Sequence, residues 1–222
     1  MEKTTGIEFP YAKDNKERLP WEYYLAEYKQ ADPQEIGQRL KIDYNSEAKQ
    51  FTVKFLGTVY HITWPEFEVS HEEDGIGYYP VEDTVAAKIL AVRYLLYGVP
   101  SLNGGEFYTY REMPSGDLYD RQFNGRCILR LAFGFGGKID RFRLAMERMG
   151  AKKLEFGDAS YEVCLTEEYY LRFILWEGDD EFPPSSQILF SDNFPNAFEA
   201  EDRTVAAEVC IGMMKSLDKI LG

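Results

Sequence analysis

The stretch from Tyr169 to Phe194 constrains the fold of this chain more than any other segment. It reads YYLRFILWEGDDEFPPSSQILFSDNF, with one apolar run from Leu171 to Trp176 and a second from Ile188 to Phe190. Short apolar runs bounded by Gly and Pro are typical of buried strands. The stretch therefore predicts two buried strands that are joined by an acidic, proline-stiffened loop.

Length and cysteine usage predict one large globular domain. A chain of 222 residues can remove roughly 70% of its unfolded surface from water, so it needs no disulfide or metal for stability. The three cysteines, Cys127, Cys164 and Cys210, are far apart and form no Cys-x-x-Cys pair, which predicts reduced thiols in a cytosolic protein. The first residues contain no signal-like apolar core, and no run approaches the ~18 apolar residues of a membrane span. We expect a cytoplasmic protein with no membrane partner.

The net charge of −13 is unevenly distributed along the chain. The segment from Glu155 to Asp202 has thirteen acidic residues and one basic residue, whereas Arg121 to Lys153 has nine basic and two acidic residues. Because neutralisation of phosphates supplies most nucleic-acid affinity, so acidic a chain is not expected to bind nucleic acid. The basic segment either packs beside the acidic one or forms an anion-binding face, for example with Arg126, Arg130 and Arg141.

Hydrophobic periodicity predicts a polar arm over residues 1–20 and a single domain over residues 21–222. In the first half we expect a helix over 21–29, a second helix capped by Asp32, and a hairpin in which Phe51, Val53 and Phe55 share one face and Gly57 forms the turn. A solvated turn is expected over 70–75. The next helix, about 82–97, is expected to face the core through Val85, Ile89, Val92 and Leu96.

The second half alternates short strands and amphipathic helices. Strands are expected over 107–111 and around Tyr161, Val163 and Leu165, and helices over about 122–132, 139–149 and from Asp202 onward. The glycines at 134, 136 and 137 are followed by lysine but complete no phosphate-binding motif, so they predict a turn between helices. Together these elements predict an α+β fold, a mainly antiparallel sheet with amphipathic helices packed on it.

Five blocks of sequence carry a resemblance to a known family. They are WP at 64–65, AVRYLLYG at 91–98, GGEFYTYREMPSGDLY at 104–119, FGDA at 156–159 and LWEGDDEFPPSSQILFSDN at 175–193. In this order, from about Pro33 to the C-terminus, they resemble the bacterial and archaeal family named domain of unknown function 3786. The Trp-Glu-Gly-Asp-x-Glu-Phe-Pro-Pro block is quite specific.

The resemblance implies a setting rather than an activity. Members of that family are common in anaerobes, and some are fused to a four-cysteine iron–sulfur module like those beside corrinoid proteins. Three scattered cysteines cannot supply a four-thiolate cluster site, so any iron–sulfur role belongs to another protein. The resemblance thus implies an accessory domain in anaerobic cofactor or one-carbon metabolism and leaves the cofactor unnamed.

The acidic loop offers one kind of chemistry. In an extended chain, Glu177, Asp179 and Glu181 would lie on one side, where they could hold a hard cation or work as an acid–base pair. The alternative is that the loop caps strand ends or pairs with the basic helices. The two histidines, His61 and His71, have neither zinc-ligand spacing nor a thiol nearby.

Aromatic residues offer a second possibility, because several flank the family-like blocks. With Arg111 they could line a pocket for a planar or carboxylate-bearing ligand, or they could belong to the core. Trp176 and Phe182 are expected to be buried beside the acidic loop. The aromatic residues considered are Trp64, Tyr108, Tyr110, Tyr119, Phe123 and Trp176. The residues expected to bind a ligand are Trp64, Arg111, Tyr119, Trp176, Asp179, Glu181 and Phe182.

These observations favour a cytosolic binding or accessory domain whose partner is a small molecule or another protein. A metal-assisted or acid–base enzyme working through Asp179 to Glu181 is one alternative. A protein-interaction module that presents an acidic face to a basic partner is another. Pattern alone does not decide whether the chain is an enzyme, and it leaves the cofactor, the metal and the oligomeric state undetermined.

Overall fold

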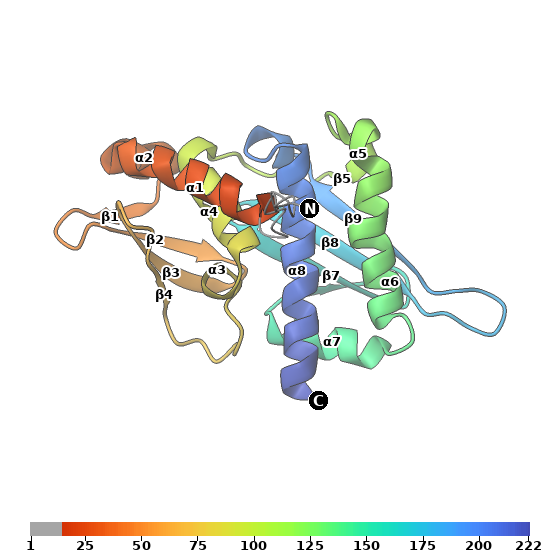
Figure 1. The fold of residues 1–222 in the computed structure, drawn as a ribbon. Helices are drawn as coiled ribbons and strands as arrows, with labels where there is room; N and C mark the ends of the chain where they lie inside the picture. The colour runs from red at the N-terminus through yellow and green to blue at the C-terminus, as the bar shows by residue number, and fades with distance from the viewer. Residues whose placement is uncertain (1–14) are drawn as a thin grey trace, which may run out of the picture.

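The structure, a computed structural model that describes residues 15–222, contains two antiparallel sheets with helices packed on them (Figure 1). The predicted α+β class is confirmed. The first part of the chain forms a four-stranded sheet with the order β1-β2-β3-β4. The second part forms a five-stranded sheet with the order β5-β9-β8-β7-β6.

In the sequence, helices precede and follow the strands of the four-stranded sheet. In order, the elements are α1 (Asn15–Gln30), α2 (Pro33–Leu40), β1 (Asp43–Asn45), β2 (Gln50–Phe55), β3 (Thr58–Thr63), β4 (Val69–His71), α3 (Pro80–Asp83) and α4 (Val85–Tyr97). The buried positions of β2 are Phe51, Val53 and Phe55, as their alternation predicts. The turn predicted over 70–75 is corrected at its first two residues, which belong to the edge strand β4, whereas residues 72–75 are in no helix or strand. Polar residues are tolerated in an edge strand because one side of it faces water.

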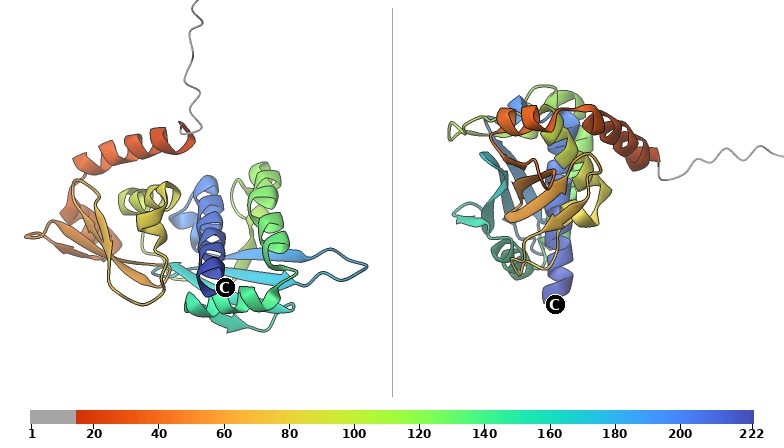
Figure 2. Two further views of the ribbon diagram at one scale, coloured as in Figure 1. Left: turned by 60° about the horizontal axis from the view of Figure 1, so that its bottom comes forward. Right: turned by 90° about the vertical axis from the view of Figure 1, so that its left-hand side faces the viewer.

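The five-stranded sheet is assembled from segments spread over the second half. They are β5 (Phe107–Thr109), the 3-10 turn η1 (Tyr110–Glu112), α5 (Gly116–Phe123), the π-helical segment η2 (Asn124–Ile128), α6 (Leu129–Phe135), α7 (Ile139–Arg148), β6 (Lys152–Leu154), β7 (Ala159–Thr166), β8 (Tyr169–Trp176), β9 (Ser185–Ser191), the 3-10 turn η3 (Phe194–Asn196) and α8 (Ala200–Leu221). Helices α6, α7 and α8 lie together on one face of this sheet (Figure 2).

Strand β8 is the middle strand of the larger sheet, so the stretch from Tyr169 onward does organise this part of the fold. It pairs with β7 on one side and with β9 on the other. Its residues Leu171, Phe173 and Leu175 are fully buried on the helix-covered face. On the opposite face Arg172 donates to Glu162 at 2.8 Å and lies over the ring of Phe107. The two apolar runs are therefore strands, as predicted.

The turn between β2 and β3 connects the two sheets. Leu56 and Gly57 both have positive φ, 50° and 88°, as the central residues of type I′ hairpin turns do. Leu56 is buried, and its N–H donates to the carbonyl of Leu165 in β7 at 2.8 Å. The hydroxyl of Thr166 donates to the carbonyl of Lys54 at 2.9 Å. The tip of the small sheet is thus inserted against the large one.

Two predicted helices differ from the observed ones at their starts. Helix α1 begins at Asn15 rather than at residue 21, so the arm expected over 1–20 overlaps the helix, and its remaining part lies outside the described residues. The helix expected over 122–132 begins at Gly116 and passes through the π-helical segment η2 into α6. Periodicity misses this start because Asp117 and Asp120 make the first turns polar.

The face of α4 is a further correction. Of the four residues expected to face the core, Val92 is buried, Ile89 and Leu96 are partly buried and Val85 is 37% exposed. Ala87, Leu90, Ala91, Tyr94 and Leu95 are also buried, so the buried surface of the helix extends well beyond the predicted face. The helix is also divided from α3 at Thr84, whose side chain accepts the N–H of Ala87. Because α4 is apolar around most of its circumference, its spacing could not identify which face is buried.

Candidate functional site

The acidic loop from Glu177 to Pro184 projects from the body of the protein between β8 and β9 (Figure 1). One oxygen of Asp179 accepts the N–H groups of Glu181 and Phe182 at 2.8 and 2.7 Å, and the Asp179 N–H donates to the Phe182 carbonyl. The N–H donors of Phe182 and Glu181 lower the pKa of Asp179, because they stabilise its charged form. Asp179 therefore closes the turn of this loop.

Trp176 and Phe182 are not buried, contrary to the prediction. Trp176 is 37% exposed and Phe182 is 67% exposed. Both were expected to hold the loop against the core, because large aromatic side chains usually bury most of their area. The loop is held by its backbone instead.

A contact with the glycine turn fixes the base of the loop. The Gly178 N–H donates to the Gly136 carbonyl at 3.2 Å. A side chain at Gly136 would overlap Pro184, and one at Gly178 would lie 2.6 Å from the Pro184 ring. The glycines between α6 and α7 form a helix–helix turn, as predicted, but they also leave the space that Pro184 occupies. No pattern in the sequence predicts that these glycines make room for Pro184.

The predicted aromatic pocket does not exist as one site. Tyr110 and Phe123 are buried and stack at 4.2 Å, which makes them core residues. Tyr119 is 47% exposed on α5, and Arg111 is exposed in η1. Trp64 follows β3 of the other sheet. The residues expected to bind one ligand thus lie in separate parts of the fold.

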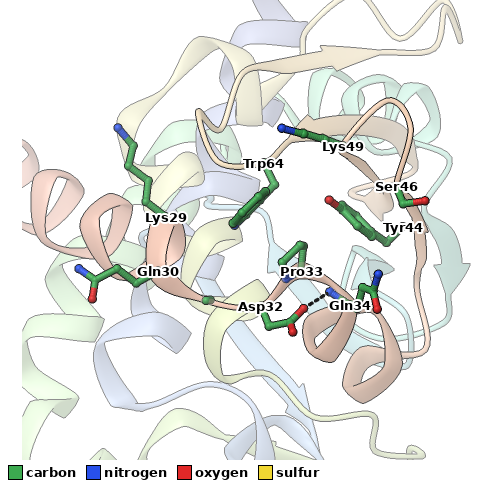
Figure 3. A pocket seen from close by; sticks show the side chains of 10 residues that line it. Lys29, Gln30, Asp32, Pro33, Gln34, Tyr44, Ser46, Lys49 and Trp64 are labelled. Atoms are coloured by element: carbon green, nitrogen blue, oxygen red, sulfur yellow. Dashed lines mark hydrogen bonds between the residues drawn. The ribbon is translucent and has the colours of Figure 1, made fainter.

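Trp64 does line a cavity, and Figure 3 shows it. The cavity has a volume of about 650 Å³ and lies where the end of α1 and the start of α2 meet the β1–β2 turn. Its lining residues are Lys29, Gln30, Ala31, Asp32, Pro33, Gln34, Tyr44, Ser46, Lys49 and Trp64. The rings of Trp64 and Tyr44 stand on opposite sides of the opening, with Pro33 between them.

The polar atoms nearest the rings are already partly used. The Trp64 indole N–H donates to the Tyr28 carbonyl at 3.1 Å, so this side chain offers only its ring face to a ligand. Asp32 caps α2 by accepting the N–H of Gln34 at 2.8 Å. Burial, followed by the negative charge of Asp32, raises the pKa of Tyr44. The hydroxyl group of Tyr44 is therefore neutral.

The two lysines of the cavity, Lys29 and Lys49, are exposed. Among the described residues, no carboxylate lies within ion-pair distance of Lys29 or Lys49. Lys49 has a φ of 50°, uncommon for a residue with a side chain. The cavity therefore combines ring faces with uncommitted positive charge, and sequence reasoning identified only Trp64 of these residues.

The charged helices pair with one another. Arg126 donates to Glu201 and Glu208 at 2.9 and 2.7 Å, and Arg141 donates to Asp218 at 2.5 Å. Two of the arginines suggested as an anion-binding face are thus paired with carboxylates of α8. Of these carboxylates, Glu201 belongs to the acidic segment 155–202, whereas Glu208 and Asp218 follow that segment in the sequence.

The thiols are free, and Cys127 and Cys210 are buried. Burial raises the pKa of all three and brings that of Cys164 to about 11, which disfavours the reactive thiolate. No three His, Cys, Asp or Glu side chains converge on a possible metal position in residues 15–222.

In residues 15–222 no helix is long and apolar enough to span a membrane. The fold is that of an α+β protein with an open cavity lined in part by aromatic residues. The chain belongs to the family described as a domain of unknown function, DUF3786, whose profile matches residues 32–213. No curated protein and no solved structure matches the chain.

Two of the blocks that identify the family have structural roles. In FGDA, Gly157 has a φ of 56°, and a side chain there would lie 2.8 Å from the Leu175 carbonyl. In the SDN sequence, the Asn193 amide donates to the carbonyls of Ser101 and Glu168 at 2.7 and 3.0 Å. These residues hold loops against the larger sheet.

Proposed function

We propose that this chain is a non-catalytic binding protein that takes a planar organic anion in the cavity beside Trp64. Rings that carry a carboxylate or phosphate form the ligand class. The observation that carries the proposal is the combination of two rings, Trp64 and Tyr44, with Lys49, whose ammonium group forms no ion pair within residues 15–222. Ring stacking and cationic attraction recognise two parts of such a ligand at once.

The composition of the cavity favours binding over catalysis. Its one carboxylate, Asp32, accepts the N–H groups that begin α2 and is not presented to a ligand as a base. A general base must reach the proton that it removes. The free thiols support a cytoplasmic location, and the family resemblance supports an accessory role in anaerobic cofactor or one-carbon metabolism; both are parts of the proposal.

Matched planar probes test the ligand class. We expect 2-naphthoate to bind in calorimetric titrations and 2-naphthylmethylammonium, which has the same ring and the opposite charge, to bind much more weakly. Trp64→Leu should weaken 2-naphthoate binding about 5- to 150-fold, since stacking on an aromatic side chain contributes about 1–3 kcal/mol. Trp21→Leu is the control, because Trp21 packs on Phe67 outside the cavity.

A second pair of variants tests the charge. Lys49→Gln should weaken binding of 2-naphthoate, whereas Lys54→Gln, an exposed lysine of β2 outside the cavity, should leave it unchanged. Melting temperatures establish that each variant is folded. Equal binding of the two probes, or equal losses for Lys49→Gln and Lys54→Gln, would contradict the proposal.

A further inference from the structure

We propose that the acidic loop and the outer face of α6 form a docking surface for a basic amphipathic helix of a partner protein. This α6–loop surface consists of Leu129, Phe133, Glu177, Asp180, Glu181 and Phe182. It lies apart from the Trp64 cavity, which belongs to the other sheet, and does not depend on the function proposed for that cavity.

The apolar part of the surface is exposed to an unusual degree. Phe133 is 66% exposed, Leu129 is 46% exposed and Phe182 is 67% exposed. Leu129 and Phe133 are four residues apart in α6, so they share one face of the helix. The contact of Gly136 with Pro184 places the loop beside the end of the same helix. Large exposed apolar side chains on one face of a helix, such as Leu129 and Phe133, favour an interaction site.

The acidic part of the surface has no internal partner. Among the described residues, no lysine, arginine or histidine forms an ion pair with Glu177, Asp179, Asp180 or Glu181. The carboxylates of α8 behave differently, since Glu201, Glu208 and Asp218 are all paired with arginines. Charge complementarity therefore selects a partner with lysines or arginines beside its apolar residues.

Hydrogen bonds within the protein fix the turn and the base of the loop. Asp179 closes its turn through two N–H donors, and the Gly178 N–H joins its base to the Gly136 carbonyl. A surface that is already ordered loses less conformational entropy on binding. A helix fits better than an extended strand, because the exposed residues lie along the outside of α6 and in a loop, where no sheet edge offers backbone partners.

Two labelled peptides of one composition test the surface with the full-length protein. One is an 18-residue leucine–lysine helix with its leucines on a single face, and the other has the same residues in scrambled order. At ~0.15 M salt, where exposed charges are screened beyond about 8 Å, we expect fluorescence anisotropy to show the facial peptide binding at least about tenfold more tightly.

Matched variants distinguish the surface from general attraction by an acidic protein. Phe133→Ser with Phe182→Ser should abolish the preference for the facial peptide. Leu102→Ser with Leu144→Ser, which changes two exposed apolar residues elsewhere, should retain it. Asp180→Asn with Glu181→Gln should weaken binding and reduce its salt dependence, whereas Glu66→Gln with Glu68→Gln should not. The proposal is overturned if both peptides bind equally or if the Phe133 and Phe182 changes have no effect.

Discussion

Two hairpins in this protein are built to opposite designs. The β2–β3 hairpin turns through Leu56 and Gly57 alone, and Leu56 is buried against β7. The β8–β9 hairpin has an eight-residue loop, Glu177–Pro184, that projects into solvent. The short turn connects one sheet to the other, whereas the long loop contacts the rest of the protein only near its base.

The comparison shows how order and burial can be separated. The β2–β3 turn is ordered because its apolar residue is inside the protein and its N–H has a partner in the other sheet. The β8–β9 loop is held by hydrogen bonds within itself, by the Gly178–Gly136 hydrogen bond and by the contact of Pro184 with Gly136, while its charged and aromatic side chains stay outside. Burial of Leu56 stabilises the first hairpin. The second hairpin has a hydrogen-bonded loop whose side chains remain exposed, and such a loop is suited to recognition.

The largest effect is expected at the buried turn. Leu56→Ala should lower the free energy of unfolding by about 2–5 kcal/mol, as other buried leucine truncations do, because Leu56 is 1% exposed. Urea unfolding followed by fluorescence and by circular dichroism measures this. Leu102→Ala, at an 83% exposed position, should stay within about 0.5 kcal/mol of the wild type. Similar losses in both variants would show that the turn does not connect the sheets.

The next effect is expected at the base of the projecting loop. Gly136→Ala places a methyl group against Pro184 and the Ala132 carbonyl, so it should destabilise the protein by about 1–3 kcal/mol, the usual cost of overpacking. Gly137→Ala is the control, because a side chain there meets nothing within 4 Å. Calorimetric melting compares the two. If both variants melt alike, the contact does not hold the loop.

Acid should loosen the loop turn by protonating Asp179. Its pKa is lowered in the folded chain by the N–H groups of Phe182 and Glu181. The ionised carboxylate therefore stabilises the turn above the ordinary aspartate pKa, and this contribution is lost as pH falls through the lowered value. Amide resonances of Glu181 and Phe182 should shift in that acidic range. In Asp179→Asn the same resonances should not titrate there; if they do, another group is responsible.

The smallest stability effect is expected at Phe182. Its side chain is 67% exposed, so Phe182→Ser should change the free energy of unfolding by no more than about 0.5 kcal/mol. A thermal melt provides the measurement. A loss of several degrees would show that Phe182 packs in solution and would remove the contrast between the two hairpins.

Alternation and apolar periodicity predicted much of the fold. Phe51, Val53 and Phe55 repeat every second residue and are buried in β2, and Ile139, Phe142 and Met146 repeat at helical spacing and are buried in α7. These patterns were sufficient because each element has one clearly apolar face. Helix α4 is apolar around most of its circumference, so the prediction was correct for Val92 and wrong for Val85.

The candidate site was harder to predict from the sequence than the fold. Lys29, Tyr44 and Lys49 come from α1, β1 and the turn after β1, and they meet Trp64 only when the small sheet folds beside the helices. Pattern also implied that Trp176 and Phe182 would be buried, since aromatic residues that flank strands usually are. Their exposure depends on where the loop points, which no local pattern encodes.

The contact of the short turn with β7 also bears on how the chain folds. The β2–β3 hairpin needs only neighbouring residues, so it can form within microseconds, as isolated hairpins do. Its bond to β7 joins residues 112 positions apart, and β5 must wait for β9 from the far end of the chain before it can pair. Closing such long loops is slow. We therefore expect the small sheet to be an early structure during synthesis and the edge strand β5 to be the last to pair.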